Sequence, residues 1–284
     1  MEISVIIPAK NESASIGQLI TGVREHCPQA EILVIDDGSS DQTADLAKAA
    51  GATVISHPHS LGNGAAIKTG ARRAQGEILV MLDADGQHDP ADIPRLLEQL
   101  KQGFDMAVGA RSASCHANTA RLAANGMYNV FASMITGHVI PDLTSGFRAV
   151  HARLFKSFLY LLPNGFSYPT TITMAFLRAG YPVQFVPIQA EKRVGKSHIR
   201  PVRDGIRFLV IIFKIATLYA PLKIFFPASF IFFGVGLAYY LYTFLTMGRF
   251  TNMSMLLFSA AVIIFLIGLI SEQITALNYK DSNV

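Results

Sequence analysis

Two long runs without a charged residue constrain the fold of this chain most. One run extends from Ile224 to Gly248 and the other from Thr251 to Ser271. A helix needs roughly 20 apolar residues to cross the hydrocarbon core of a bilayer, and each run is long enough. A helix in a soluble core is usually apolar on one stripe only, whereas these runs are apolar all round. The sequence therefore predicts two membrane-spanning helices.

The residues beside these spans predict the topology. The link from Gly248 to Thr251 is short, so the spans, at about 224–247 and 252–272, form a hairpin with both flanks on one side of the membrane. Residues 191–223 carry eight basic and two acidic residues. Such an excess marks the cytoplasmic side. We therefore expect a protein integral to the cytoplasmic (inner) membrane, with its amino-terminal domain and both termini in the cytoplasm.

The basic residues before the first span also indicate a lipid partner. Between residues 201 and 223 they alternate with apolar residues, which predicts amphipathic helices lying at the membrane interface. A net charge of +4 and a pI near 9.1 could suggest nucleic acid, but basic residues concentrated beside a span favour lipid headgroups and phosphates. We therefore expect a lipid bilayer and no nucleic acid as partners.

Two further features bear on the compartment. Met1 leads directly into a strand pattern, so no signal peptide is expected. Cys27 and Cys115 fall in the part predicted to be cytoplasmic, so neither a disulfide nor a zinc site is expected from them.

Strand and helix patterns alternate over most of residues 1–200. Short apolar runs predict strands, and apolar residues at helical spacing between them predict helices. The strands are expected at 3–9, 31–36, 53–56, 77–82, 105–109 and 182–188. The helices are expected from about residue 16 and at 41–50, 65–75, 90–102 and 118–140. Strands separated by helices imply right-handed βαβ units, so residues 1–200 predict an α/β domain with a mostly parallel sheet.

Polar clusters follow three of the predicted strands. They are Lys10-Asn11-Glu12, Asp36-Asp37-Gly38-Ser39 and Asp83-Ala84-Asp85-Gly86-Gln87. Each cluster alone fits a turn or a helix cap, but parallel strands bring their carboxyl ends to one edge of a sheet, where ligands bind. Alternate side chains of a strand share a face, so we expect Asp83 and Asp85 to project the same way from the carboxyl end of the strand at 77–82. Two carboxylates beside a diphosphate suit Mg²⁺ or Mn²⁺.

These motifs resemble those of the family 2 inverting glycosyltransferases with the GT-A fold. The similarity lies in Val5–Glu12, Val34–Ser39 and Asp83–Gln87. The segment Asp142–Arg148 and the two-helix tail are similar to the polyprenyl-phosphate glycosyltransferases, which include dolichyl-phosphate mannosyltransferase and bacterial undecaprenyl-phosphate sugar transferases. The resemblance covers residues 3 to about 200. It implies a GT-A nucleotide-sugar-binding domain of the α/β class, followed by interfacial helices and a transmembrane hairpin at 224–277.

The resemblance also implies a donor site for a UDP- or GDP-hexose. Pro8, Glu12 and Asp37 would line the base and ribose pocket, and Gly62-Asn63-Gly64 would cover the nucleotide. The nucleotide-sugar set that it implies is Pro8, Asn11, Glu12, Asp37, Gly64, Lys68, Asp83 and Asp85. Asp83, Asp85 and Gln87 would hold Mg²⁺ or Mn²⁺ on the diphosphate, and Asp85 would be a catalytic residue for that reason.

A polyprenyl phosphate acceptor needs cations rather than a general base. The second pKa of a phosphate monoester is about 6, so the acceptor is largely dianionic near neutral pH. Arginine forks bind such a group best. The acceptor-phosphate candidates are Arg111, Arg121, Ser145, Arg193 and Arg200. Arg148 and Asp142 are further catalytic candidates, with Asp142 orienting the sugar or an arginine.

Other functions stay open at this point. A family 2 transferase that adds sugar to a saccharide or lipid hydroxyl would need a carboxylate base and usually more spans. A non-catalytic, membrane-anchored nucleotide-sugar-binding protein would keep the fold, but intact acidic and arginine sets favour an enzyme. A nucleotidyltransferase is a weaker alternative, because no glycine-rich loop with a lysine is present. Family resemblance also allows a homo-oligomer formed through the spans, for which Gly234 and Gly236 are a packing hint.

The histidines are expected to have structural rather than chemical roles. His88 adjoins the metal motif, and we expect it on the surface at the entry to a helix. His57 and His59 flank Pro58 in a predicted loop, where we expect no part in the chemistry.

Overall fold

A computed structural model describes residues 2–111, 119–165, 168–189, 213, 217 and 220–280. The chain divides into two compact units, residues 1–208 and 209–284. The predicted interfacial helices at 201–223 lie almost wholly outside the described residues, and the predicted boundaries at 200 and 223 stay predictions.

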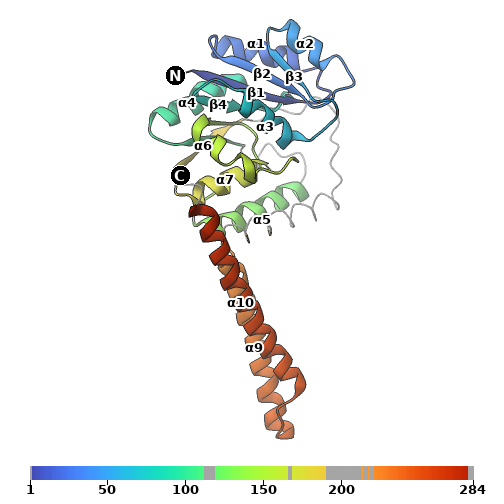
Figure 1. The fold of residues 1–284 in the computed structure, drawn as a ribbon, viewed down its shortest axis with the longest axis vertical. Helices are drawn as coiled ribbons and strands as arrows, with labels where there is room; N and C mark the ends of the chain where they lie inside the picture. Colours follow the sequence, from blue (N-terminus) through green and yellow to red (C-terminus); the bar gives the residue numbers. More distant parts are fainter. Residues whose placement is uncertain are drawn as a thin grey trace. The chain divides into compact units, whose positions relative to one another are not determined.

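The first unit is an α/β domain built on a 7-stranded sheet (Figure 1). Its strands are β1 Ile3–Ala9, β2 Glu31–Asp36, β3 Thr53–Ser56, β4 Ile78–Met81, β5 Met106–Arg111, β6 Arg148–His151 and β7 Val183–Ile188. Its helices are α1 Ile16–His26, α2 Thr43–Ala49, α3 Asn63–Arg73, η1 Pro90–Asp92, α4 Ile93–Lys101, α5 Thr119–Thr136, α6 Ala152–Ser157, η3 Leu159–Leu161 and α7 Tyr168–Arg178.

The sheet is mostly parallel, as the sequence predicts. Its strand order is β3-β2-β1-β4-β6-β5-β7. Only β6 runs against its two neighbours, β4 and β5, and the other strand pairs are parallel. The pattern of residues 142–150 indicates a loop and the start of a strand. This local pattern does not predict that the strand inserts between β4 and β5, because the pairing of β4 with β6 joins residues about 70 positions apart.

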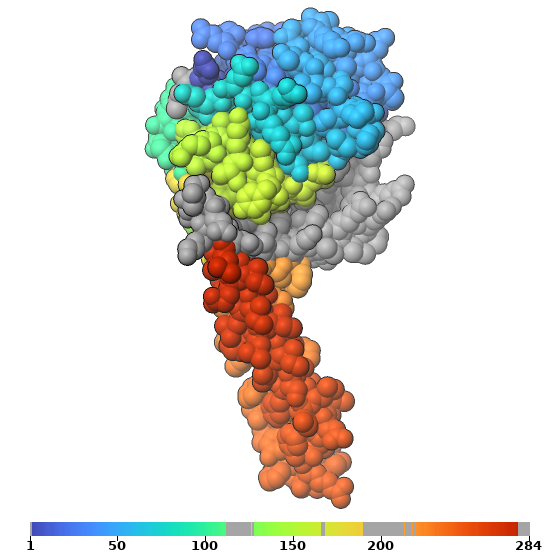
Figure 2. Space-filling model, in the orientation of Figure 1, coloured from blue at the N-terminus to red at the C-terminus, as the bar shows by residue number. Residues whose placement is uncertain are grey.

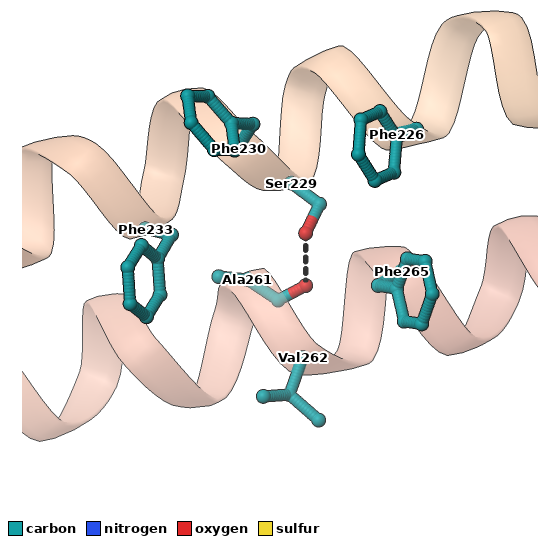
Figure 3. Close-up of a pocket in the computed structure, with 7 residues that line it drawn as sticks. All are labelled: Phe226, Ser229, Phe230, Phe233, Ala261, Val262 and Phe265. Atoms are coloured by element: carbon teal, nitrogen blue, oxygen red, sulfur yellow. Dashed lines mark hydrogen bonds between the residues drawn. The ribbon is translucent and has the colours of Figure 1, made fainter.

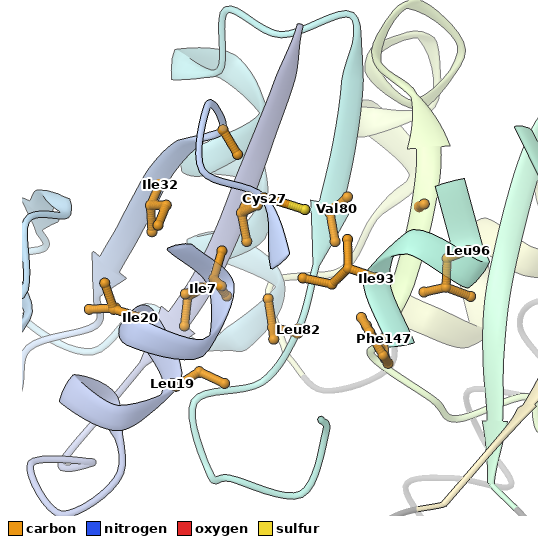
Figure 4. Close-up of a cluster of buried hydrophobic side chains, with 14 of the residues drawn as sticks. Ile7, Leu19, Ile20, Cys27, Ile32, Val80, Leu82, Ile93, Leu96 and Phe147 are labelled. Carbon is orange, nitrogen blue, oxygen red and sulfur yellow. The ribbon is translucent and has the colours of Figure 1, made fainter. Parts of the chain in front are cut away.

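Alternate residues of the central strands pack against helices on opposite faces. On one face, Ile7 and Val80 form a cluster with side chains of α1 and α4 (Figure 4). On the other face, α3 packs on β1 and β2. A Cβ built on Gly70 of α3 would lie 2.4 Å from Cγ2 of Ile6, so the glycine allows the helix to approach β1 closely. Such burial on both faces explains the continuous apolar runs of these strands.

The carboxyl end of β4 differs from the sequence expectation. The strand ends at Met81 rather than Leu82, and a turn begins at Ala84. Pairing with both neighbouring strands stops at Met81. Met81 pairs with Ile6 of β1 on one side, and on the other side it pairs with Arg148, the first residue of β6. Asp83 and Asp85 therefore lie in a loop beyond the strand, and the shared strand face expected for them was wrong.

The second unit contains two long apolar helices, α9 Leu222–Met247 and α10 Asn252–Lys280. Both are long and apolar enough to cross a membrane, and most of their side chains are exposed rather than buried. They lie against each other in the space-filling view (Figure 2). Gly248, with φ of 64°, ends α9 and begins the short link that the sequence predicts.

Small residues let the two helices approach closely. A Cβ on Gly268 would lie 2.6 Å from the Phe225 side chain, and one on Gly236 would lie 3.0 Å from Leu257. Ser229 donates a hydrogen bond to the carbonyl oxygen of Ala261 at 2.8 Å, beside the rings of Phe226 and Phe233 (Figure 3). Gly236 therefore packs within the hairpin, whereas a Cβ on Gly234 would meet nothing within 4 Å. A homo-oligomer stays a prediction.

Candidate active site

The carboxyl edge of the sheet gathers the predicted site residues from separate segments. Strands β1, β2, β4 and β5 end at this edge, and the antiparallel β6 begins there. The Ser15 hydroxyl, at the entry to α1, donates to the Ala84 carbonyl oxygen at 2.6 Å. The Asn11 amide donates to the Ser39 hydroxyl at 2.9 Å. The expectation that the three polar clusters lie together is confirmed.

Hydrogen bonds join the loops after β1 and β2. Asn11 has a φ of 56°, a left-handed conformation that asparagine tolerates well. Its side-chain oxygen accepts a bond from the Ser40 amide at 2.8 Å, and the Glu12 amide donates to the Thr43 hydroxyl at 2.9 Å. Pro8 is buried on the part of β1 that extends past β4 and pairs there with Ile35 of β2. These residues build one wall of the edge, and their contact with a nucleotide stays a prediction.

Asp37 organises the loop that follows β3. One carboxylate oxygen accepts from His57 Nδ1 and the Leu61 amide, each at 2.8 Å. The other accepts from the Ser60 hydroxyl at 2.7 Å and the Gly62 amide at 2.9 Å. Burial alone would raise the pKa of Asp37, but these hydrogen bonds outweigh it and lower the pKa to about 2. The carboxylate is thus ionised, and its acceptor positions are filled by protein groups.

The amino terminus of α3 contacts residues 162–165 of the chain. The Gly64 amide donates to the Gly165 carbonyl oxygen at 3.2 Å, and the Ala65 amide donates to that of Asn164 at 3.0 Å. Lys68 Nζ donates to the Leu162 carbonyl oxygen at 3.0 Å and also bonds the Asn164 side chain. Helix amino termini can bind phosphate, but here main-chain oxygens already bind these amides. The nucleotide-binding roles of Gly64 and Lys68 stay predictions.

Asp83, Asp85 and Gln87 offer oxygen donors on the loop after β4. All three are partly buried, and the Asp85 carboxylate accepts the Gln87 amide at 3.2 Å. Within the described residues, no group of three or more His, Cys, Asp and Glu side chains could enclose a metal ion. Two carboxylates with an amide oxygen nevertheless fit Mg²⁺, which is usually held by one or two carboxylates together with substrate phosphates and water. These residues would hold such an ion.

Arg111 and Asp142 form an ion pair next to that loop. Arg111 Nε and one terminal nitrogen reach the two Asp142 oxygens at 2.7 and 3.1 Å, and the same terminal nitrogen donates to Thr144 Oγ1 at 2.7 Å. Burial would lower the pKa of Arg111, but Asp142, Asp83 and Asp85 raise it. Burial would raise the pKa of Asp142, but Arg111 and two amides lower it. Asp142 is therefore suited to orienting an arginine and poorly suited to general-base work.

Arg148 lies inside the domain, which the sequence did not predict. Its side chain is 0% exposed, and its terminal nitrogens donate to the carbonyl oxygens of Ser145 and Pro169 and to the Thr173 hydroxyl. Ser145 is also fully buried. A polyprenyl phosphate could not reach the Arg148 guanidinium without opening the domain. Direct catalytic contact by Arg148 is therefore wrong for this structure, and acceptor contact by Ser145 would require the same opening.

Two histidines also differ from expectation. His88 is buried, at 4% exposure, with its ring 5.2 Å from that of Phe147, so the surface position was wrong. Burial, the largest cause, and Arg111 lower its pKa to about 4, against the opposing effect of Asp85. His57 bonds Asp37 and, through Nε2, the Thr69 hydroxyl at 2.9 Å, so it supports the site. The one sequence feature that bears on the position of His88 is that it stands two residues before Pro90, where η1 begins. This feature does not predict that the ring is buried.

Three acceptor candidates cannot be placed. Arg193 and Arg200 lie outside the described residues, and Arg121 lies on α5 at a position where only the backbone is described. Of the predicted acceptor set, the structure therefore places Arg111 at the sheet edge and Ser145 in the buried interior. The roles of the remaining three stay predictions.

Profiles of known families match both units of the chain. The profile of glycosyl transferase family 2 matches residues 4–159. A profile described as the GtrB C-terminal hairpin matches residues 220–277. The first match covers more than half of the chain, and the second coincides with α9 and α10.

Similar proteins extend these matches. Polyprenol monophosphomannose synthase of Mycolicibacterium smegmatis is 30% identical over 228 residues, which make up 75% of this chain and 84% of that protein. Undecaprenyl-phosphate 4-deoxy-4-formamido-L-arabinose transferase of Pseudomonas aeruginosa is 32% identical over 184 residues, or 58% of this chain and 54% of that protein.

A solved structure shares the fold of the first unit. Glucosyl-3-phosphoglycerate synthase from Mycobacterium tuberculosis, in complex with Mn²⁺, UDP and glucosyl-3-phosphoglycerate, superposes with a TM-score of 0.62. The match is 22% identical and covers 76% of this chain and 79% of that chain. The same enzyme with Mg²⁺ and UDP gives a TM-score of 0.63 at 23% identity, with coverage of 76% and 79%. The fold is GT-A-like.

Proposed function

Because this chain belongs to glycosyl transferase family 2, we propose that it transfers a hexose from a nucleoside-diphosphate sugar to a polyprenyl phosphate, with inversion at the anomeric carbon. The chain is a glycosyltransferase with a GT-A-like domain and two apolar helices that could span a membrane. Relatives named for mannose and arabinose transfer to polyprenyl phosphates support this acceptor class.

The proposed step exchanges one bond to the sugar for another. An acceptor phosphate oxygen forms a bond to the anomeric carbon from the face opposite the diphosphate. The bond from that carbon to the diphosphate oxygen breaks, and its electron pair leaves with the nucleoside diphosphate. No proton has to be removed, because the acceptor phosphate, with a second pKa of about 6, is already largely dianionic.

The single observation that carries the proposal is Arg111 beside the acidic loop. Its guanidinium carries a raised pKa, is held by Asp142 and interacts with Asp83 and Asp85. A fixed cation at this place can bring an anionic nucleophile next to a diphosphate that would otherwise repel it. A hydroxyl acceptor would instead need a base, and Asp142, which is paired with Arg111, is a poor one.

The divalent ion and the donor complete the proposal. Asp83, Asp85 and Gln87 would hold Mg²⁺ or Mn²⁺, which neutralises charge developing on the departing diphosphate. Crystals of the structural neighbour with Mn²⁺ or Mg²⁺ and UDP support a divalent ion in this fold. The donor would be a UDP- or GDP-hexose, with the loops of Asn11 and Asp37 forming its nucleotide side.

The membrane placement forms part of the same proposal. The chain would be integral to the cytoplasmic (inner) membrane through α9 and α10, with the transferase domain and both termini in the cytoplasm. The apolar exterior of the hairpin and the basic residues at 191–223 support this topology.

Radiolabel transfer tests the function directly. The purified full chain is incubated with undecaprenyl phosphate and a panel of UDP- and GDP-hexoses, with Mn²⁺ or with EDTA. We expect label in the lipid phase from one donor, in the Mn²⁺ arm only. If folded protein that binds nucleotide gives no lipid label from any donor, the proposal is wrong.

A further inference from the structure

Arg148 is a buried cation without a carboxylate partner in the part of the chain that the structure describes. Its side chain is 0% exposed, and its polar contacts are main-chain oxygens, the Thr173 hydroxyl and, at 3.9 Å, the sulfur of Met106. Burying a charge costs several kcal/mol even after relaxation. Because of this cost, we expect the guanidinium to hold neighbouring main-chain groups in place, which a smaller apolar side chain would not do.

The contacts of Arg148 converge on one turn. The guanidinium donates to the Ser145 carbonyl oxygen and lies 5.7 Å from the centre of the Tyr168 ring. The Tyr168 hydroxyl donates to the Gly146 carbonyl oxygen at 3.3 Å. Arg148 and Tyr168 therefore hold the successive carbonyl groups of Ser145 and Gly146 in the turn that leads into β6. We name these two side chains the turn clamp.

The turn that they hold touches the acidic loop. A Cβ built on Gly146 would lie 2.5 Å from Oδ2 of Asp83, so a methyl group there would displace the end of that side chain. On its other oxygen, Asp83 accepts a long bond of 3.5 Å from the Asn63 side chain. The Asp83 carboxylate therefore lies between the Gly146 backbone and the start of α3, and a shift of the turn would move it.

The positive charge of Arg148 supports the same role as its hydrogen bonds. Burial, the largest cause, lowers the pKa of Arg148, while Tyr168, Asp142 and Asp83 raise it. The clamp thus places a positive charge within electrostatic range of both Asp83 and Asp142.

We propose that Arg148 and Tyr168 are positioning residues that hold the Gly146 backbone against Asp83 and so fix this carboxylate for the divalent ion and the donor diphosphate. The inference rests on the proposed function for its donor and gives Arg148 a different role from acceptor binding. Removing the clamp should therefore affect metal and donor and leave the acceptor step unchanged.

Two variants test the clamp without deleting the buried charge. Tyr168→Phe keeps the ring and loses the bond to Gly146, and Gly146→Ala inserts a methyl group against Asp83. Tyr181→Phe is the matched control, because it removes a hydroxyl from a tyrosine whose ring packs with Phe158 and Phe176 in the same domain. Mn²⁺ binding to the full chain is measured from the electron paramagnetic resonance signal of the free ion, and the Michaelis constants of donor and acceptor are measured separately.

We expect Tyr168→Phe to weaken Mn²⁺ binding and raise the donor KM about 2- to 13-fold, the range that one hydrogen bond of about 0.5–1.5 kcal/mol gives. Gly146→Ala should have the larger effect, and the acceptor KM should stay within twofold in both variants. Unchanged Mn²⁺ binding and donor KM in both variants, or a lower kcat alone, would overturn the inference.

A third comparison addresses the charge. Arg148→Lys keeps the cation and should preserve more of the Mn²⁺ affinity than Arg148→Met, provided that both fold by circular dichroism. Equal affinities in the two folded variants would refute the electrostatic part of the inference. If the wild-type chain transfers no sugar, the proposed function fails, but Mn²⁺ binding by Tyr168→Phe and Gly146→Ala still decides the role of the clamp.

Discussion

Replacement of Asp37 by asparagine should destabilise the domain in a pH-dependent way. The carboxylate accepts four hydrogen bonds from residues 57–62, two on each oxygen. An amide keeps one acceptor oxygen and turns an NH₂ group towards the other two donors. A buried donor without an acceptor costs about 1–3 kcal/mol, so the two donors together imply that Asp37→Asn should lower the free energy of unfolding by about 2–6 kcal/mol at pH 6.

The pH dependence has a definite sign. The pKa of Asp37 falls from 3.8 to about 2 on folding, which corresponds to roughly 2.5 kcal/mol of stability. Because the folded-state pKa is the lower one, this stability is present above pH 3.8 and is lost as the pH falls towards 2. The difference between the wild type and Asp37→Asn should therefore shrink by roughly that amount between pH 6 and pH 2.

Urea unfolding of the full chain in detergent, followed by far-UV circular dichroism at several pH values, measures this difference. Asp45→Asn is a suitable control, because Asp45 is exposed on α2 and its replacement should change stability by no more than about 0.5 kcal/mol. A difference between the wild type and Asp37→Asn that stays constant from pH 6 to pH 2 would refute the reasoning.

Three further predictions concern the site and the core. Asp85→Ala should lower lipid-linked sugar transfer at least about 100-fold with an unchanged circular dichroism spectrum, since loss of roughly 3 kcal/mol of metal-assisted stabilisation has that effect; full activity would remove Asp85 from the metal site. Arg111→Lys loses the forked pairing with Asp142 and should raise the acceptor KM about tenfold while the donor KM stays within twofold. Arg121→Ala should show the same pattern. A raised donor KM with an unchanged acceptor KM would instead assign either arginine to the donor side. Gly70→Ala should destabilise the domain by about 1–3 kcal/mol in urea unfolding because its methyl group would clash with Ile6, whereas Gly17→Ala on α1, with open space around it, should be neutral or stabilising; equal effects would contradict the close approach of α3 to β1.

The sequence predicts most of the sheet because its strands are buried on both faces. The bounds expected for the first three strands agree with β1, β2 and β3, since apolar runs bounded by turn residues leave few alternatives. The resemblance to family 2 and to its polyprenyl-phosphate branch is confirmed by the matched profiles and relatives. The metal, the donor and the orientation in the membrane stay proposals.

Side-chain partners were harder to predict, because they depend on contacts between distant segments. Arg148 has the sequence context of a phosphate ligand, and only the insertion of β6 between β4 and β5 shows that it is buried. His88 was placed on the surface for the same reason, since the Phe147 ring that covers it lies about 60 residues away. Tyr168 and Gly146 were missed altogether, because a main-chain contact with Asp83 has no sequence signal.

The antiparallel course of β6 divides the catalytic domain into exchangeable parts. The chain leaves the ligand-binding edge at the end of β5 and re-enters the sheet at the same edge at the start of β6. The described residues of this excursion, 119–147, thus lie between two paired strands, while the segments around Asp37 and Asp83 belong to the sheet that precedes it. Replacement of this excursion by that of a relative, with Gly146 and Phe147 kept because they contact Asp83 and the hydrophobic core, would exchange one wall of the proposed reaction site, which makes it a natural unit for the divergence of acceptor preference.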